Sequence, residues 1–324
     1  MLDGTTIMVP VLTGHARFSP FRAAPPNADG TTILERDGVA VATIAFVAKP
    51  RFYNLQTFDG IAYWKLATLH GRDVLATTVL QSCVRYSVRA TACQFCAIGQ
   101  SLAEGRTIER KTPAQLAEVA RAAQLLDGVR HVVLTTGTPD TTDRGARILC
   151  ESAAAIKEAT ELAIQAQCEP PDDFEWFSRL RGAGVDALGM HLEAVEPEVR
   201  AAIMPGKARV AMDYYYAAFE AAVRVFGRGQ VSTYLIAGLG DSAESLLAAS
   251  RRLIALGVYP FVVPFVPISG TPLADHAARS AAFMRSVLEP LGAMLADARL
   301  FAVDVKAGCA RCNACSSLAA VYGG

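Results

Sequence analysis

The feature that most constrains the fold is a regular alternation of short apolar runs and longer amphipathic segments between about residues 75 and 297. The expected strands cover residues 75–85, 131–134, 162–166, 185–192, 230–237 and 258–266. The expected helices cover residues 114–126, 144–160, 172–183, 208–226, 243–256 and 278–297. Alternation at this spacing predicts a parallel sheet with helices outside it. About six such units are too few for an eight-unit barrel, and the periodicity alone allows a doubly wound sheet equally.

The first 80 residues follow a different pattern. Residues 38–48 and 57–66 are rich in Val, Ile, Tyr and Thr, and turn pairs such as Asp37-Gly38 and Asp59-Gly60 separate them. This pattern predicts a small β-rich lobe or an N-terminal wrap. We therefore expect three parts: an N-terminal lobe (1–80), a barrel domain (81–300) and a Cys-rich C-terminal segment (301–324).

Composition restricts the partners of the chain. Apolar residues make up 52% and charged residues 19%, which permits a large core and excludes global disorder. Lys plus Arg and Asp plus Glu both number 31, which argues against nucleic acid or an acidic membrane as the main partner. No apolar run has the length of a membrane span, and no basic stretch precedes an apolar one at the N-terminus. We expect a cytoplasmic protein.

Six of the eight cysteines fall in two tight groups, which in a reduced compartment indicates metal binding. The first group is Cys83, Cys93 and Cys96. Three thiolates can hold a four-iron cluster and leave one iron open to a small molecule. The alternative is a structural zinc site, but zinc prefers four protein ligands and no fourth Cys or His lies nearby in the sequence.

The segment Cys93-Gln94-Phe95-Cys96 resembles the signature of the radical S-adenosylmethionine (SAM) superfamily. The usual signature has three residues between its first two cysteines, whereas nine separate Cys83 from Cys93 here. Lengthening a closed loop threefold costs roughly 1 kcal/mol of entropy, which is little against cluster ligation. The resemblance implies a [4Fe-4S] cluster ligated by these three cysteines, with SAM on the open iron.

Later strand ends strengthen the resemblance. Residues 135–139 resemble the segment that binds the SAM amino group, residues 189–193 match the ribose segment of biotin and lipoyl synthases, and residues 236–241 resemble the adenine segment. A basic residue after the fourth strand would bind the SAM carboxylate. The resemblance thus implies these SAM-binding residues: Phe95, Thr135, Thr136, Gly137, Glu193, Lys207, Arg209, Ile236, Gly238 and Gly240. Taken with the strand–helix alternation, it predicts a partial (β/α)6 TIM-type barrel.

Within the superfamily the sequence resembles the biotin-synthase-like branch. Its nearest resemblance is to the radical SAM protein of bacterial nitrilase-associated gene clusters. The resemblance implies that one electron from a donor such as flavodoxin or ferredoxin cleaves SAM to methionine and a 5′-deoxyadenosyl radical. That radical would remove hydrogen from a small-molecule substrate. Sulfur insertion, rearrangement and dehydrogenation all stay open, and no catalytic residue is identified.

The second group, Cys309, Cys312 and Cys315, resembles the start of a bacterial ferredoxin motif without its fourth cysteine. An auxiliary iron–sulfur cluster, a zinc site and a metal-free redox tail are the three alternatives. Cys168 ends the third strand and is either a fourth ligand, a catalytic thiol or a small buried residue, and Cys150 is expected in the core. The competing function for the whole chain is an iron–sulfur or zinc protein, such as an electron carrier or scaffold, without SAM chemistry.

Overall fold

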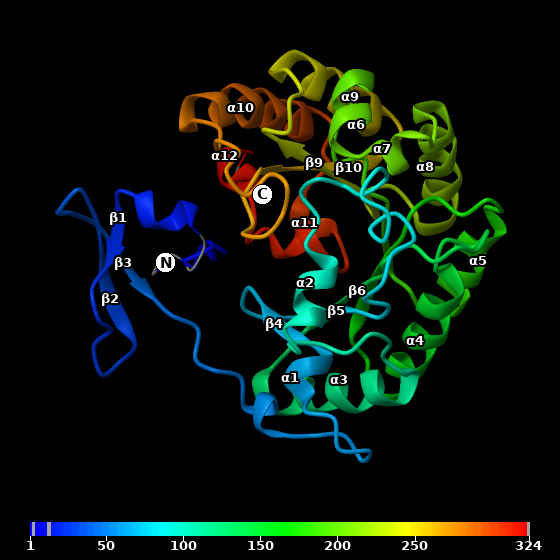
Figure 1. Cartoon of the computed structure of the whole chain (residues 1–324), viewed down its shortest axis with the longest axis horizontal. Coiled ribbons are helices and arrows are strands. Elements are labelled where there is room, and N and C mark those ends of the chain that lie inside the picture. Colours follow the sequence, from blue (N-terminus) through cyan, green and yellow to red (C-terminus); the bar gives the residue numbers. More distant parts are fainter. Residues whose placement is uncertain (2–3, 12–13, 323–324) are drawn as a thin grey trace.

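The computed structural model describes residues 1, 4–11 and 14–322 and contains a curled sheet of seven strands in the order β10-β9-β8-β7-β6-β5-β4 (Figure 1). The strands are β4 (Thr68–His70), β5 (Val74–Thr78), β6 (His131–Thr135), β7 (Ala163–Gln167), β8 (Ala187–Gly189), β9 (Val231–Ala237) and β10 (Val258–Pro264). All neighbours from β5 to β10 pair in parallel, and β4 pairs antiparallel with β5. The six parallel strands confirm the predicted partial (β/α)6 barrel.

Six long helices form the outer layer of the barrel: α3 (Pro113–Asp127), α4 (Ala146–Ala159), α5 (Glu175–Gly182), α8 (Met212–Phe226), α9 (Ala243–Ala255) and α10 (Ala281–Asp297). Their starts follow local sequence signals. In α3, Thr112 and Gln115 form a reciprocal capping box around Pro113, and Gly128 ends the helix in the left-handed conformation. The remaining helices are short: α1 (Tyr63–Leu66), α2 (Ile98–Ala103), α6 (Pro197–Ile203), α7 (Pro205–Ala208), α11 (Cys309–Cys312) and α12 (Leu318–Tyr322).

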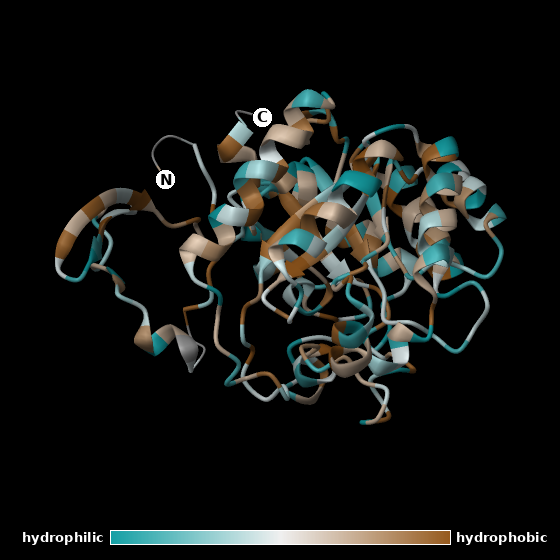
Figure 2. Ribbon diagram, turned by 90° about the horizontal axis from the view of Figure 1, so that it is seen from above, coloured by the Kyte–Doolittle hydropathy of each residue, from teal (hydrophilic) through white to brown (hydrophobic). Residues whose placement is uncertain are grey.

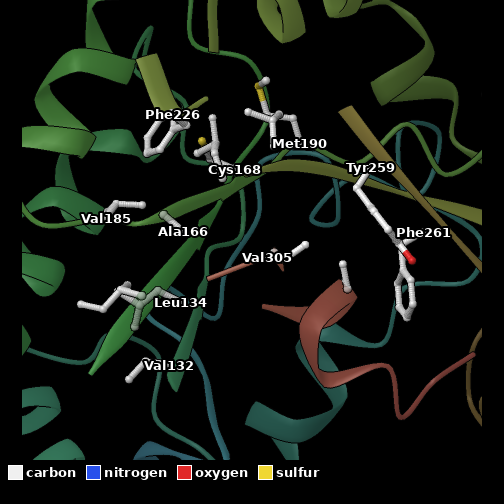
Figure 3. Packing of buried hydrophobic residues seen from close by; sticks show 14 of the residues in the cluster. Val132, Leu134, Ala166, Cys168, Val185, Met190, Phe226, Tyr259, Phe261 and Val305 are labelled. Atoms are coloured by element: carbon white, nitrogen blue, oxygen red, sulfur yellow. The ribbon is translucent and has the colours of Figure 1, made fainter. Parts of the chain in front are cut away.

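Successive side chains along each strand point alternately into the core beneath the helices and into the inside of the barrel. Val132 and Leu134 of β6 are fully buried in the main core, which also contains Ala166 of β7 and Phe226 of α8 (Figure 3). The strands at the centre of the barrel accordingly include strongly apolar stretches in Figure 2. Side chains at the intervening positions, such as Thr135, point to the opposite face, which is the inside of the barrel.

The N-terminal lobe is a separate antiparallel sheet of β1 (Phe21–Ala23), β2 (Thr31–Arg36) and β3 (Val39–Ala45), which lies beside the barrel in Figure 1. This confirms the small β-rich lobe. Residues 57–66 do not join this sheet: Thr57 donates a hydrogen bond to Asp59 in a tight turn, and α1 follows.

Two expected barrel strands are shorter in the structure. The strand expected at 75–85 ends at Thr78, because the chain then turns into the loop that carries the first cysteine group. The strand expected at 185–192 is reduced to β8. Both β4 and β5 precede residue 80 yet pair into the barrel sheet, and the three-part domain division stays a prediction.

The C-terminal segment lies between the two edge strands of the barrel sheet. Ser316 donates a hydrogen bond to the carbonyl of Val262 on β10 at 2.6 Å. On the opposite edge, the Cys315 sulfur lies 3.4 Å from Nε2 of His70 on β4. The segment therefore spans the side at which the partial barrel would otherwise be open. Among the described residues, no helix is long and apolar enough to cross a membrane.

Candidate active site

The three cysteines of the first group lie in the loop that follows β5 and precedes α2. All three are free thiols and partly buried. Burial, with a smaller contribution from Glu193, raises the pKa of Cys93 to about 12, and burial raises that of Cys96 to about 11. Cys96 also interacts electrostatically with Cys83, and Cys93 with Cys96. The three sulfurs therefore share one region, and a bound cation would favour the deprotonated forms of Cys93 and Cys96.

Within the described residues, no three His, Cys, Asp or Glu side chains gather closely enough to ligate a single metal ion. The thiolates of a four-iron cluster bind different irons, so they stand farther apart than the ligands of one zinc ion. Three thiol donors without a fourth fit a cluster that keeps one open iron.

A buried ion pair lies beside this loop. Lys207 Nζ is 2.8 Å from Glu193 Oε2, and Lys207 is only 7% exposed. Burial alone would lower the pKa of Lys207, but the carboxylate of Glu193, helped by Glu169, raises it above its usual value. Cys93 interacts with both members of the pair. The pair therefore places a permanent cation and an anion within reach of the cysteine loop.

A second buried ion pair joins the cysteine loop to the end of β7. Arg85 donates from Nε and Nη2 to the two oxygens of Glu169, at 2.8 and 2.6 Å. The Thr138 hydroxyl also donates to Glu169 at 3.0 Å. Burial would raise the pKa of Glu169, but the Arg85 hydrogen bond, Lys207 and Thr138 hold it below its usual value.

Sequence reasoning missed Glu169, and it included Thr138 only as part of the segment 135–139. One signal was present: Thr138 and Glu169 follow the carboxyl ends of β6 and β7 closely. In a parallel barrel these ends meet at the same mouth, where functional side chains gather.

Glu193 has an unusual backbone. Its φ of +66° is rare for a residue with a side chain. Its N–H donates to the carbonyl of Tyr234 at 2.9 Å, and its carbonyl accepts from Ile236 at 2.8 Å. These two bonds to β9 hold the strained conformation, which aims the carboxylate at Lys207.

The ends of β9 and β10 provide an apolar wall next to the cysteines. Cys93, Phe95 and Ile236 pack against a small buried cluster that includes Leu239 and Phe265. Gly238, at a φ of +124°, lies against Phe265, and Gly240, at a φ of +145°, lies against Val199. A side chain at either glycine would be strained and would close the space at this wall.

The loop after β6 lies directly against the cysteine loop. A Cβ on Gly137 would be 2.1 Å from the carbonyl oxygen of Ser82, and the Gly137 N–H donates to Leu80 at 2.8 Å. The Thr136 hydroxyl donates to the Gly137 carbonyl at 2.7 Å. Only glycine at this position allows so close an approach to the residue before Cys83.

The expected site residues differ in their surroundings. Phe95, Glu193, Lys207 and Ile236 lie beside the cysteines, as the contacts above show. Thr135 lies deeper, where its hydroxyl is 2.8 Å from that of Thr78. Arg209, by contrast, is exposed at the end of α7, although it is two residues from the buried Lys207.

Cys309 of the second cysteine group lies inside the barrel among neutral polar side chains, whereas Cys312 lies near the charged Asp73. Gln167 Nε2 donates to the Cys309 sulfur at 3.3 Å, and the Tyr234 hydroxyl is hydrogen-bonded to the same sulfur. The Cys309 N–H donates to Gln165 at 3.3 Å, and the Gly308 N–H donates to Nδ1 of His131 at 3.1 Å. These contacts place α11 within the barrel.

His191 contacts Tyr234, which is hydrogen-bonded to Cys309, and it interacts electrostatically with Lys207. Its Nδ1 accepts from the Tyr234 N–H at 3.1 Å, and its ring meets that of Tyr234 edge-on. Its Nε2 is buried and has no partner among the described protein atoms. Burial lowers the pKa of His191 to about 3, so the ring is neutral.

Cys168 lies on the opposite face of β7 from the second cysteine group. Gln167 points into the barrel towards Cys309, so the next residue points outwards. Cys168 is buried in the main core, as Figure 3 shows together with Phe226 and Met190. Cys150, on α4, packs partly buried against the same core.

The fold and this site define a class: a partial parallel barrel with three free cysteines in the loop after its first parallel strand and buried charges at its mouth. The profile of the radical SAM superfamily matches residues 90–253, which is about half of the chain. The chain belongs to the radical SAM superfamily.

Similar proteins agree with this assignment. Bacteriochlorophyllide c C-7(1)-hydroxylase of Chlorobaculum limnaeum is 32% identical over 115 residues, or 35% of this chain and 28% of the relative. Lipoyl synthase of Thermus thermophilus is 29% identical over 175 residues, or 52% and 50% of the two chains. The structure of methylornithine synthase aligns with a TM-score of 0.51 at 18% identity, over 69% and 62% of the two chains. The matches thus span about a quarter to a half of the curated relatives.

Proposed function

We propose that this protein reductively cleaves SAM at a [4Fe-4S] cluster held by Cys83, Cys93 and Cys96, and removes hydrogen from a small-molecule substrate. The observation that carries this proposal is the buried charged network beside the three thiols. Lys207, Arg85, Glu193 and Glu169 supply two cations and two anions there. A site that binds the ammonium, carboxylate and sulfonium of SAM needs charges of both signs.

The residues of the chain have separate roles in this proposal. When bound, the cluster supplies the electron that breaks a carbon–sulfur bond of SAM. Lys207 attracts the SAM carboxylate, and Glu193 accepts hydrogen bonds from the ribose. The backbone at Thr136 and Gly137 meets the amino group, and Ile236 packs on the adenine. Phe95 and Gly238 shape the apolar wall and exclude water.

We also propose an auxiliary iron–sulfur cluster held by Cys309, Cys312 and Cys315. Its support is the position of Cys309 inside the barrel and the hydrogen-bond donors Gln167 and Tyr234 directed at its sulfur. Such donors stabilise thiolate ligands. Cys168 faces away from this group, whereas Nε2 of His70 lies 3.4 Å from the Cys315 sulfur. We therefore propose His70 as its fourth ligand.

We also propose a branch of the superfamily, an electron donor, a location and a domain division for this chain. Similarity to a lipoyl synthase supports placement in the biotin-synthase-like branch, and we retain the proposed kinship with the radical SAM protein of nitrilase-associated clusters. We propose a flavodoxin or ferredoxin as the electron donor and a cytoplasmic location. The division into an N-terminal lobe, a barrel and a Cys-rich segment is also kept.

The test is anaerobic purification and reconstitution with iron and sulfide, followed by dithionite and SAM. The protein should release 5′-deoxyadenosine and methionine, measured by mass spectrometry, and a Cys93→Ala variant should release neither. Iron binding without SAM binding or cleavage would overturn the proposal and favour the electron-carrier alternative.

A further inference from the structure

A pocket of about 660 Å³ opens beside the cysteine loop, between α1, β5, the end of β6 and the segment after α2. Three of the six lysines line it, Lys49, Lys65 and Lys111, together with Arg106. Among the described residues that line it there is no Asp or Glu. Glu104, outside the lining, pairs with Arg106 at 2.6 Å, but the three lysines still give the pocket a positive lining in a chain that is neutral as a whole.

Lys111 is the most informative of these residues. It is 4% exposed, and its Nζ donates to the Thr77 hydroxyl at 3.0 Å. Lys207 is buried to a similar degree but has its own carboxylate, Glu193, at 2.8 Å. In the described part of the chain, no carboxylate forms an ion pair with Lys111. Burial lowers the pKa of Lys111 to about 8, and a bound anion would offset the cost of burying its charge.

The rest of the lining suits an organic molecule. Tyr53 and Trp64 contribute apolar surface. Thr78 and Thr135, whose hydroxyls are 2.8 Å apart, contribute donors and acceptors. Apolar walls with a few directed polar groups are typical of small-molecule sites.

The pocket shares a wall with the cysteine loop. Thr135 lines the pocket and directly precedes Thr136 and Gly137, which lie against that loop. Gln81 also lines it, and its amide donates at 3.0 Å to the carbonyl of Ile98, two residues after Cys96. A molecule in the pocket would therefore lie next to the proposed SAM site.

We propose that this pocket binds the substrate, and that the substrate is a small organic anion whose carboxylate or phosphate group pairs with Lys111 while its apolar body rests against Trp64. That the bound anion is the substrate of this protein rests on the function proposed above. That the pocket binds an organic anion does not depend on that function, because binding can be measured without SAM cleavage.

The test is isothermal titration of the anaerobically reconstituted full chain with phenylacetate, phenyl phosphate and neutral phenylacetamide. We expect at least one anion to bind about tenfold or more tightly than the amide, because only the anions pair with Lys111. The tighter anion distinguishes a carboxylate from a phosphate substrate. Lys111→Met should reduce anion affinity to that of the amide. Lys306→Met, which removes an exposed lysine outside the pocket, should not.

Lys65→Met, at a partly exposed position, gives a second measure if thermal melting shows that Lys111→Met is destabilised. It should weaken anion binding by a smaller factor. The inference is overturned if neither anion binds, if the amide binds as tightly as the anions, if both variants bind like the wild type, or if SAM displaces the anion. Anion binding in a protein that never cleaves SAM would leave the pocket standing and reject the proposed radical chemistry.

Discussion

Cys93 of the first cysteine group and Cys309 of the second lie in different electrostatic environments. Cys93 lies beside the buried pair of Lys207 and Glu193, whereas Cys309 lies among the uncharged side chains of Gln167 and Tyr234. Fixed charges of both signs suit a site that must bind a small zwitterion and a cluster together. Neutral hydrogen-bond donors suit a cluster that stays bound and whose reduction potential they adjust. The difference predicts that the first group carries the SAM chemistry and the second does not.

The largest effects should come from removing the cysteine ligands of either cluster. A Cys93→Ala variant should lose SAM cleavage, because the first cluster loses a ligand. A triple Cys309/Cys312/Cys315→Ala variant should lose about half of about eight irons and still cleave SAM. Iron analysis and 5′-deoxyadenosine assays on anaerobic samples measure both. Equal iron in the triple variant and the wild type, or zinc in place of iron, would contradict a second cluster.

Docking of the C-terminal segment should depend strongly on Gly308. Its φ is +108°, and a Cβ there would lie 2.1 to 2.4 Å from the side chain of the buried Gln165. Gly308→Ala should therefore displace the segment, with loss of the second cluster's iron and faster hydrogen exchange around residues 305–320, while SAM cleavage persists. Gly182→Ala, in a helix with open space around the added Cβ, is the matched control. Unchanged iron and exchange in Gly308→Ala would show that the segment is not held in this way.

A smaller effect is expected at the charged site. Glu193→Ala should weaken SAM binding about tenfold, because the charge-assisted hydrogen bonds proposed between Glu193 and the ribose are lost. Iron content and the cluster absorption should not change. Glu158→Ala, which removes an exposed carboxylate from α4, is the control. Equilibrium binding of SAM to the oxidised protein measures the difference, and wild-type affinity in Glu193→Ala would exclude this residue from the site.

The sequence predicted those parts of the site that depend on local order. The spacing of Cys93 and Cys96, and the strand ends at Gly137 and Ile236, can be located along the chain because each strand end is marked by its own residues. The pairing of Arg85 with Glu169 could not be predicted, because the two residues are 84 positions apart in the sequence and come together only in the folded barrel.

The packing of the C-terminal segment inside the barrel could not be predicted for a related reason. Gln165 and Gln167 occupy alternate positions of a short strand, and nothing local shows that Cys309, 142 residues after Gln167, packs against them. Polar residues at alternate positions also occur on strands that face water. Cys168 was the visible candidate for a ligand, but the alternation of β7 turns it outwards.

The smallest effect is expected from substitution of His70, which tests the fourth ligand of the proposed second cluster. If His70 is its fourth ligand, His70→Ala should retain the iron held by three cysteines, while the electron paramagnetic resonance signal of the reduced second cluster changes shape. His70→Cys should restore a four-ligand site and a signal with all-cysteine character. The measurement is made in a Cys93→Ala background, where the first cluster does not contribute. An unchanged signal in His70→Ala would mean that the 3.4 Å contact to Cys315 is only a hydrogen bond and that the fourth iron takes its ligand elsewhere.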